Sequence, residues 1–432
     1  MKGKIKIMSL LLATAMVSSM FVACKKDDPA TNNGSSDAKN PASKVEVPKD
    51  KGKDDEKLLW YHWGESPKKP DAVIKALNEQ SKKDINTEIE FRFAPDEEKL
   101  KTVISTAGEF DITFTCSWFA NYVQAAQKNQ FADLSQYDRI KTITPNLWAS
   151  MPESYWDGAK VNGKIYGVPT YKDTAATQFW RFNKEFVYDG AKAEAEAKAT
   201  QDSLKLSKLT PVLEKVKQYA DKGNKYPHGL TAPISMNWAG LNGYNNGWDT
   251  VSSDDLRIGF KIDGGDTKLV SMYADADFID NMKTLQDWNK RGLSNKGASQ
   301  LEKEPEFTCV GTGQAWPSAN VAVYNVKKDY HEELVKKCGP YLTTAGVQGS
   351  MQAISPGSKH INKSLKYIEY MNTNATYRTM LGRGIEGTDW KKDANGTAET
   401  LTDNWLPGLF SQASFMPLLP AAPAPVDMYT KE

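Results

Sequence analysis

Residues 58–64 read Leu-Leu-Trp-Tyr-His-Trp-Gly, an apolar run that predicts a strand ending in a loop. Residues 87–93 alternate apolar and charged side chains, which predicts a second strand with one buried face. A third strand is predicted at residues 110–115, Phe-Asp-Ile-Thr-Phe-Thr. Helices are predicted between these strands, around residues 73–77 and at 97–106. Strands that alternate with helices at this spacing predict a parallel sheet flanked by helices.

Ligands of such sheets bind beyond the carboxyl ends of the strands. This rule selects residues 62–65 after the first strand and 116–121 after the third. Each loop carries a tryptophan, Trp63 in one and Trp118 in the other. Topology and composition therefore predict the same candidate site.

The N-terminus has the features of an export signal. Lys2, Lys4 and Lys6 precede an apolar run at residues 7–21 that is shorter than the roughly 20 residues needed to span a bilayer. The run ends in Phe-Val-Ala before Cys24, which resembles the lipobox of bacterial lipoproteins although Leu is usual where Phe21 stands. We expect a signal peptide at 1–23 and lipid on Cys24; an ordinary secretory signal with an incidental cysteine is the alternative.

Composition predicts the domain organisation. Residues 24–57 are charged and poor in apolar side chains, which predicts a disordered tether. The remaining body of roughly 375 residues suits two domains. We expect a first lobe at 58–180 that also includes part of the C-terminal region, a second lobe at 181–345, a return segment contributing to both lobes at 346–393, and an irregular tail at 394–432.

Charge and cysteines exclude several classes of function. The net charge of +1 gives no electrostatic basis for nucleic-acid binding. Metal-binding patterns such as CxxC and HExxH are absent, and we expect neither a metal site nor a cofactor. Cys116, Cys309 and Cys338 are an odd set, so one disulfide is conceivable but no pair is favoured.

The aromatic residues favour carbohydrate binding. Twelve tryptophans are many for this length, and Trp63, Trp118, Trp238 and Trp248 stand beside Gly, Asn or Ser rather than in apolar runs. A flat ring stacks on the apolar face of a pyranose while polar neighbours bond its hydroxyls. The alternative for each single tryptophan is a half-buried packing residue.

Three segments carry a family resemblance. They are Phe-Asp-Ile-Thr-Phe at 110–114, Gly-Lys-Ile-Tyr-Gly-Val-Pro at 163–169, and Arg-Gly-Ile-Glu-Gly at 383–387. Together they resemble the extracellular solute-binding proteins of ABC importers, which include maltodextrin-binding proteins, from residue 58 to about 390. The third segment is similar to a subgroup of sugar-binding lipoproteins with an extra C-terminal domain of unknown function, which we expect to be missing here.

The resemblance implies two α/β lobes joined by crossing strands, with a ligand in the cleft between them and closure about a hinge. It implies Glu386 as a residue that covers the cleft, with a salt bridge in a tight turn as the alternative. The binding residues that it implies in the two lobes are His62, Trp63, Ser117, Trp118, Tyr171, Asp173, Trp238 and Trp316.

The expected function is capture of a carbohydrate, outside the cytoplasm, by a lipid-anchored monomer that delivers it to the permease subunits of an ABC importer. Catalysis is not expected, because GxSxG and Walker A motifs are absent and the four histidines show no triad pattern; His331 is expected in a surface helix. Two other binding functions remain open. One is a surface glycan-binding lipoprotein without an ABC partner, and the other is a peptide or amino-acid binder on the same scaffold.

Overall fold

The computed structural model describes most of the chain after residue 45. The described residues are 46–171, 176–183, 204–221, 247–250, 258–262, 268–294, 310–315, 332–405, 412–414 and 417–419. The predicted signal peptide, Cys24 and the first part of the predicted tether lie outside them. Within the described part, none of the helices is both long and apolar enough to cross a membrane.

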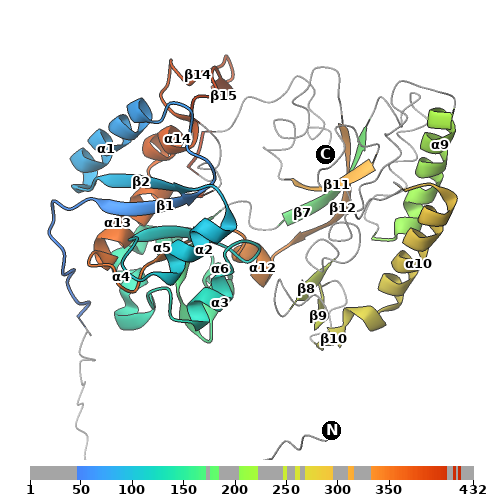
Figure 1. The fold of residues 1–432 in the computed structure, drawn as a ribbon, viewed down its shortest axis with the longest axis horizontal. Coiled ribbons are helices and arrows are strands. Elements are labelled where there is room, and N and C mark those ends of the chain that lie inside the picture. Colours follow the sequence, from blue (N-terminus) through green and yellow to red (C-terminus); the bar gives the residue numbers. More distant parts are fainter. Residues whose placement is uncertain are drawn as a thin grey trace, which may run out of the picture. The chain divides into compact units, whose positions relative to one another are not determined.

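The first lobe is built on a five-stranded sheet of order β2-β1-β3-β13-β6 (Figure 1). The elements before residue 170 are β1 (Leu58–Trp63), α1 (Asp71–Ile85), β2 (Ile89–Ala94), α2 (Glu97–Ser105), β3 (Ile112–Thr115), α3 (Tyr122–Gln127), α4 (Arg139–Ile143), α5 (Pro145–Ser150), α6 (Glu153–Gly158), β4 (Lys160–Val161), β5 (Lys164–Ile165) and β6 (Gly167–Pro169). The later elements are α12 (Thr344–Val347), β13 (Met351–Ile354), α13 (Ile361–Thr373), α14 (Ala375–Arg383), β14 (Trp390–Lys392) and β15 (Ala398–Thr400).

The three predicted strands form the parallel part of this sheet. β1 pairs with β2 from Leu58 opposite Ile89, and with β3 where Trp60 lies opposite Ile112. β13 returns late in the chain and pairs antiparallel with β3 and β6. Every residue of β3 is buried, as expected for a strand in the middle of a sheet covered on both faces.

Helix boundaries follow from local chemistry. The Asp96 side chain accepts a hydrogen bond from the backbone N–H of Lys99 and starts α2. α1 buries Val73 and Leu77 and ends at Asn86, which adopts the left-handed conformation with φ 50°. Because the strand order reverses at β1, right-handed crossovers place α1 and α2 on opposite faces. α1 packs beside α14 (Figure 1).

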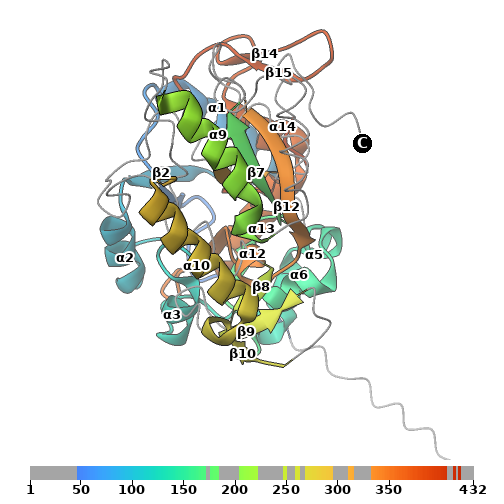
Figure 2. The same ribbon diagram turned by 90° about the vertical axis from the view of Figure 1, so that its right-hand side faces the viewer.

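The second lobe has a three-stranded antiparallel sheet of order β11-β7-β12 and a smaller one of order β10-β9-β8. Figures 1 and 2 both show helices α9 and α10 beside each other. The elements are β7 (Ala176–Asn183), α9 (Thr210–Asp221), β8 (Trp248–Thr250), β9 (Ile258–Lys261), β10 (Val270–Ser271), α10 (Ala276–Arg291), β11 (Val310–Ala315) and β12 (Glu332–Tyr341).

The second lobe has a hydrophobic core of its own. Trp180 of β7, Leu213 of α9 and Trp288 of α10 belong to one buried cluster, separate from the cluster of the first lobe. The Trp288 Nε1 donates to Thr210 Oγ1 across 2.9 Å and ties the two helices together. Gly292 caps α10 with φ 68°. The two clusters agree with the predicted two-lobed fold.

One prediction made from local pattern differs from the structure. β12 begins at Glu332, so the stretch beginning at His331, which we predicted as helix, is a strand from its second residue onward. The pattern of its charged residues fits both a helix and a strand, and hydrogen bonding to β7 makes it a strand. Among the described strands, β7 (Ala176–Asn183) pairs with β11 and β12, so the lobe limit expected at 181 falls within this strand and stays a prediction.

The predicted tether is partly held against the first lobe. The carboxylate of Asp50 accepts the backbone N–H groups of Asn362 and Lys363 at the start of α13. Glu56 lies 2.8 Å from His360 Nε2. Composition predicted disorder because residues 46–57 offer little apolar surface, whereas the segment is held by polar contacts instead.

The predicted irregular tail contains packed residues. Trp405 is buried in the first core, and its Nε1 donates to the carbonyl of Leu381 across 3.0 Å. Gln412, Ala413 and Ser414 are also buried. In the described part of the tail, these residues therefore belong to the core of the first lobe.

Candidate functional site

An aromatic cluster forms where β1 and β3 end. Trp63 is the last residue of β1, and Trp118 stands in the loop after β3. Their ring centroids are 5.2 Å apart with the planes at 79°, an edge-to-face contact. Phe119 lies 4.9 Å from Trp63, and Phe114 stacks on Trp63 at 5.9 Å. We call Trp63, Phe114, Trp118 and Phe119 the aromatic cluster.

Trp118 is the exposed member of this cluster, with 56% of its surface accessible. It is not a mobile surface ring, because its Nε1 donates to the carbonyl of Gly349 across 2.8 Å. The contact with Trp63 and this hydrogen bond fix the indole in one orientation. The result is a flat apolar face held open to solvent beyond the carboxyl ends of parallel strands, where the sequence predicted a site.

Ser117 has a supporting role in the structure. It is 7% exposed, and its hydroxyl donates to the carbonyl of Ala345 across 3.1 Å. Its backbone N–H donates to the carbonyl of Gln348 across 2.8 Å. These bonds join the Trp118 loop to helix α12. We predicted that Ser117 contacts the solute, whereas its hydroxyl proton is directed to the protein backbone.

His62 lies in the core, not at the site. It is 0% exposed and stacks on Phe91 at 5.2 Å and on Phe93 at 5.5 Å. The cause is its register in β1, where even-numbered residues face the interior and Trp63 faces the other way. Burial lowers the pKa of His62 to about 3, so its ring is neutral near pH 7. In this arrangement it does not reach a solute.

Tyr171 and Glu386 contact residues other than those of the aromatic cluster. Tyr171 is half-buried and meets Tyr155 edge to face at 5.5 Å. Glu386 is exposed in the turn after α14 and, in the described part of the chain, forms no ion pair. It lines a separate pocket of about 410 Å³ with Met380, Trp390 and their neighbours. Neither of the two roles expected for Glu386 is therefore observed.

Four further predicted residues, Cys24, Asp173, Trp238 and Trp316, lie outside the described residues. Trp248, singled out as a loop tryptophan, is buried in β8 and is a packing residue. Cys116 and Cys338 are buried and not joined in a disulfide. In the described part of the chain, no group of three or more His, Cys, Asp or Glu side chains is placed to hold a metal ion.

The second lobe brings one carboxylate to helix α12 that the sequence did not indicate. Asp249 of β8 accepts the backbone N–H of Thr344, the residue next to Ala345, which binds Ser117. Its Oδ1 is buried without a hydrogen-bond partner among the described residues, and burial raises the pKa of this carboxyl. Asp249 has no pattern around it in the sequence that would have marked it.

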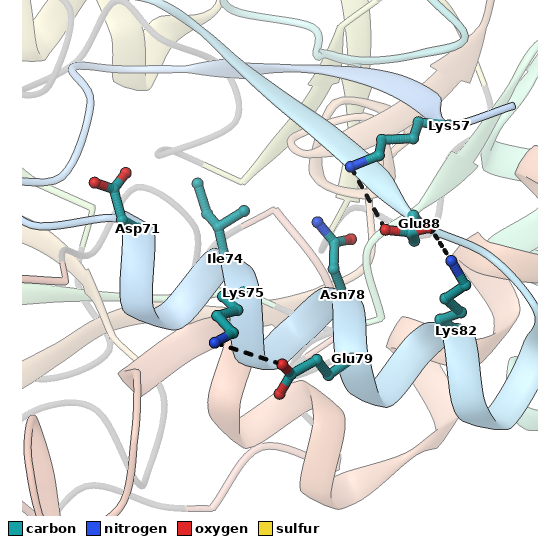
Figure 3. A pocket seen from close by; sticks show the side chains of 8 residues that line it. All are labelled: Lys57, Asp71, Ile74, Lys75, Asn78, Glu79, Lys82 and Glu88. Carbon is teal, nitrogen blue, oxygen red and sulfur yellow. Dashed lines mark hydrogen bonds and ion pairs between the residues drawn. The ribbon is translucent and has the colours of Figure 1, made fainter.

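A groove on the outside of α1 differs in character from the aromatic cluster. It has a volume of about 430 Å³ and is lined mostly by charged side chains, with Ile74 as its apolar member (Figure 3). Glu88 pairs with Lys57 at 3.5 Å and with Lys82 at 2.6 Å, and the three lysines that line the groove are balanced by three carboxylates. The groove offers no aromatic face, and we do not assign a solute to it.

No protein-family model matches the chain. A curated relative, described as a carbohydrate ABC transporter substrate-binding protein of Streptococcus pneumoniae serotype 4 (strain ATCC BAA-334 / TIGR4), is 25% identical over 349 residues. The match covers 78% of this chain and 65% of the relative, so the chain spans less than two thirds of that protein.

Solved structures show the same fold. The crystal structure of the N-glycan transport solute binding protein NgtS from Streptococcus pneumoniae matches with a TM-score of 0.69 and 20% identity, over 84% of this chain and 78% of that one. Its complex with Man5GlcNAc matches with a TM-score of 0.65 and 21% identity, over the same shares. The alginate-binding protein AlgQ2 matches with a TM-score of 0.52 and 14% identity, over 85% and 78%.

These likenesses confirm the two-lobed α/β fold predicted from the sequence. They also confirm the resemblance on which that prediction depended. The chain has the fold of solute-binding proteins and is similar in sequence to one described as serving carbohydrate ABC transport.

Proposed function

We propose that this protein binds a carbohydrate at the aromatic cluster. The observation that carries the proposal is Trp118, a ring 56% exposed yet held in place by Trp63 and by the Gly349 carbonyl. Exposing an apolar ring to water is unfavourable, so covering it with a ligand lowers the free energy. The ring lies beyond the ends of parallel strands, where ligands of such sheets bind, and its flat face can stack on a flat apolar surface of the ligand. Pyranose rings present an apolar face of this kind, with hydroxyls at the rim.

The comparisons support an oligosaccharide as the solute. NgtS is described in complexes with Man1GlcNAc and with Man5GlcNAc, and the curated relative is described as serving carbohydrate transport. A neutral glycan would place hydroxyl donors near carboxylates such as Asp249 without bringing a charge. We further propose that Asp173 and Tyr171 from the first lobe, and Trp238 and Trp316 from the second, complete the site.

The cellular role follows from the solute and the N-terminus. We propose that lipid on Cys24 anchors the protein outside the cytoplasm, with the signal peptide at 1–23 removed. A solute captured there is delivered to the permease subunits of an ABC importer by a monomer. The role is binding and not catalysis, and it needs no cofactor. We also propose that the lobes begin near residues 58 and 181 and that the return segment begins near 346. Strand β7 of the second sheet starts slightly earlier, at Ala176.

A thermal-shift screen of the purified protein tests the solute class. The panel holds Man1GlcNAc, Man5GlcNAc and other neutral oligosaccharides, with free amino acids and short peptides as controls. A melting temperature that rises and saturates with one carbohydrate supports the proposal, because ligand that binds only the folded state stabilises it. A rise with amino acids or peptides alone would contradict the carbohydrate assignment and leave the two-lobed binder.

A second measurement separates delivery to an importer from simple surface binding. Uptake of the identified glycan is compared in cells that have or lack the protein, and in cells that have or lack each candidate ABC permease. Loss of uptake in both deletions supports the ABC role. Uptake that needs this protein but no ABC permease would favour a surface glycan-binding lipoprotein instead.

A further inference from the structure

Three buried residues near the C-terminus, Gln412, Ala413 and Ser414, contact the end of β1 and the segment after β6. We propose that they are a positioning strap that fixes Trp63 and Tyr171 for the solute. This inference rests on the proposed function, because it assigns the strap to that same site.

The first contact of the strap is with β1. Gln412 Nε2 donates to the carbonyl of Trp63 across 3.0 Å. The Gln412 carbonyl in turn accepts from Gln352 Nε2 at 2.7 Å, and Gln352 Oε1 accepts from Trp60 Nε1 at 2.9 Å. Gln352 lies in β13, so this chain of hydrogen bonds begins and ends on β1. It holds the strand end that carries the Trp63 ring.

The second contact is with the segment after β6. The backbone N–H of Tyr171 donates to Ser414 Oγ across 2.9 Å. Both the Trp63 bond and the Tyr171 bond use backbone atoms, so they set the position of each residue and leave its ring available. Two residues that the sequence predicted as binding residues, 108 positions apart, are thus held by one short segment.

The strap is itself held by the helices behind the sheet. Arg378 Nε donates to the carbonyl of Ser414 at 2.7 Å, and its Nη2 donates to that of Ala413 at 3.1 Å. Asn372 Oδ1 accepts the backbone N–H of Ser414 at 2.6 Å. Arg378 is fully buried, and the two carbonyls replace part of its lost hydration. A buried guanidinium of this kind fixes the strap rigidly, since moving the strap would leave the charge unsatisfied.

The chain provides a matched control for the Ser414 bond. Farther along, the backbone N–H of Leu419 donates to Thr379 Oγ1 at 3.1 Å. Both bonds join a backbone N–H to a hydroxyl oxygen, and both lie in the same C-terminal region. Only the Ser414 bond ends on a predicted binding residue. Removing either hydroxyl should affect stability alike, while only one should affect the site.

The experiment measures the dissociation constant of Man5GlcNAc by calorimetry for the unaltered protein, Ser414→Ala, Ser414→Thr and Thr379→Val. If the unaltered protein does not bind Man5GlcNAc, the carbohydrate from the thermal-shift panel that it does bind is used. We expect Ser414→Ala to weaken binding about fivefold, the effect of about one hydrogen bond. Ser414→Thr keeps the hydroxyl and should restore affinity, and Thr379→Val should leave it unchanged at a similar melting temperature.

The outcomes separate the strap from the proposed function. If no carbohydrate binds the unaltered protein, the proposed function fails, and the strap assignment fails with it. If the unaltered protein binds and Ser414→Ala binds equally well, or Thr379→Val loses as much, the strap assignment alone is overturned. Should Ser414→Ala fail to fold, Gln412→Met removes the donor to Trp63 while keeping the Gln412 carbonyl, and the same comparison decides.

Discussion

Replacing Trp118 with alanine should weaken carbohydrate binding by about twentyfold. An aromatic side chain buries up to about 250 Å², and the accessible 56% of Trp118 corresponds to roughly 140 Å² on that scale. A pyranose covers one face, or about half of this area. At about 25 cal/mol per Å², the roughly 70 Å² covered is worth about 1.8 kcal/mol.

The same substitution should also lower stability. The exposed face of Trp118 contributes little to folding, but the ring loses its edge contact with Trp63 and its hydrogen bond to Gly349, which contributes about 1 kcal/mol. Trp118→Phe is the control, because it keeps an aromatic ring and loses the Nε1 donor. It should retain most of the affinity that Trp118→Ala loses.

Calorimetric titration with the carbohydrate found in the thermal-shift screen measures the effect, and thermal melting without ligand reports on the fold. Equal affinity of Trp118→Ala and the unaltered protein would remove Trp118 from the site. A loss in Trp118→Phe as large as that in Trp118→Ala would also refute the reasoning, since stacking would then not be the source of the affinity.

The other predictions concern His62, Arg378 and Glu386. Because the pKa of His62 is lowered to about 3 in the folded chain, the unfolded chain binds a proton that the folded chain does not below about pH 6.5. The free energy of unfolding therefore falls as the pH drops below that value, by up to about 2 kcal/mol at pH 5. In urea unfolding, His62→Gln should lose less free energy of unfolding between pH 7 and pH 5 than the unaltered protein does. Equal decreases in both proteins would contradict the buried, neutral assignment. Arg378→Met leaves the Ala413 and Ser414 carbonyls without these donors and should lower the free energy of unfolding by about 2–4 kcal/mol; a change within about 0.5 kcal/mol would show that the contact is dispensable. Glu386→Gln alters a residue of the separate pocket beside Trp390 and should leave carbohydrate affinity unchanged, whereas a tenfold loss in calorimetry would place Glu386 at the site after all.

The parallel part of the sheet in the first lobe could be predicted because its signals are local. Each of the three strands carries its own apolar pattern, and the loops after two of them carry Trp63 and Trp118. The rule that ligands bind beyond the carboxyl ends of strands needs only the order of strands and helices. The cap at Gly292 was predictable for the same reason, since one residue in the left-handed conformation ends the helix.

The residues that support the site could not be predicted because their contacts are distant in sequence. Ser414 meets Tyr171 and Gln412 meets Trp63 through pairings that no local period encodes. That the His62 side chain points into the core was missed for a related reason. The run at residues 58–64 is apolar throughout, so it does not show which residues point inward until the helices cover the sheet.

The most direct test of the central claim is a crystal structure of the protein with the carbohydrate that raises its melting temperature. The account predicts a pyranose ring stacked within about 4 Å of the Trp118 indole, with Trp63 still in edge contact behind it. A carbohydrate bound elsewhere, such as in the pocket lined by Met380 and Trp390, with the Trp118 face left uncovered, would contradict it.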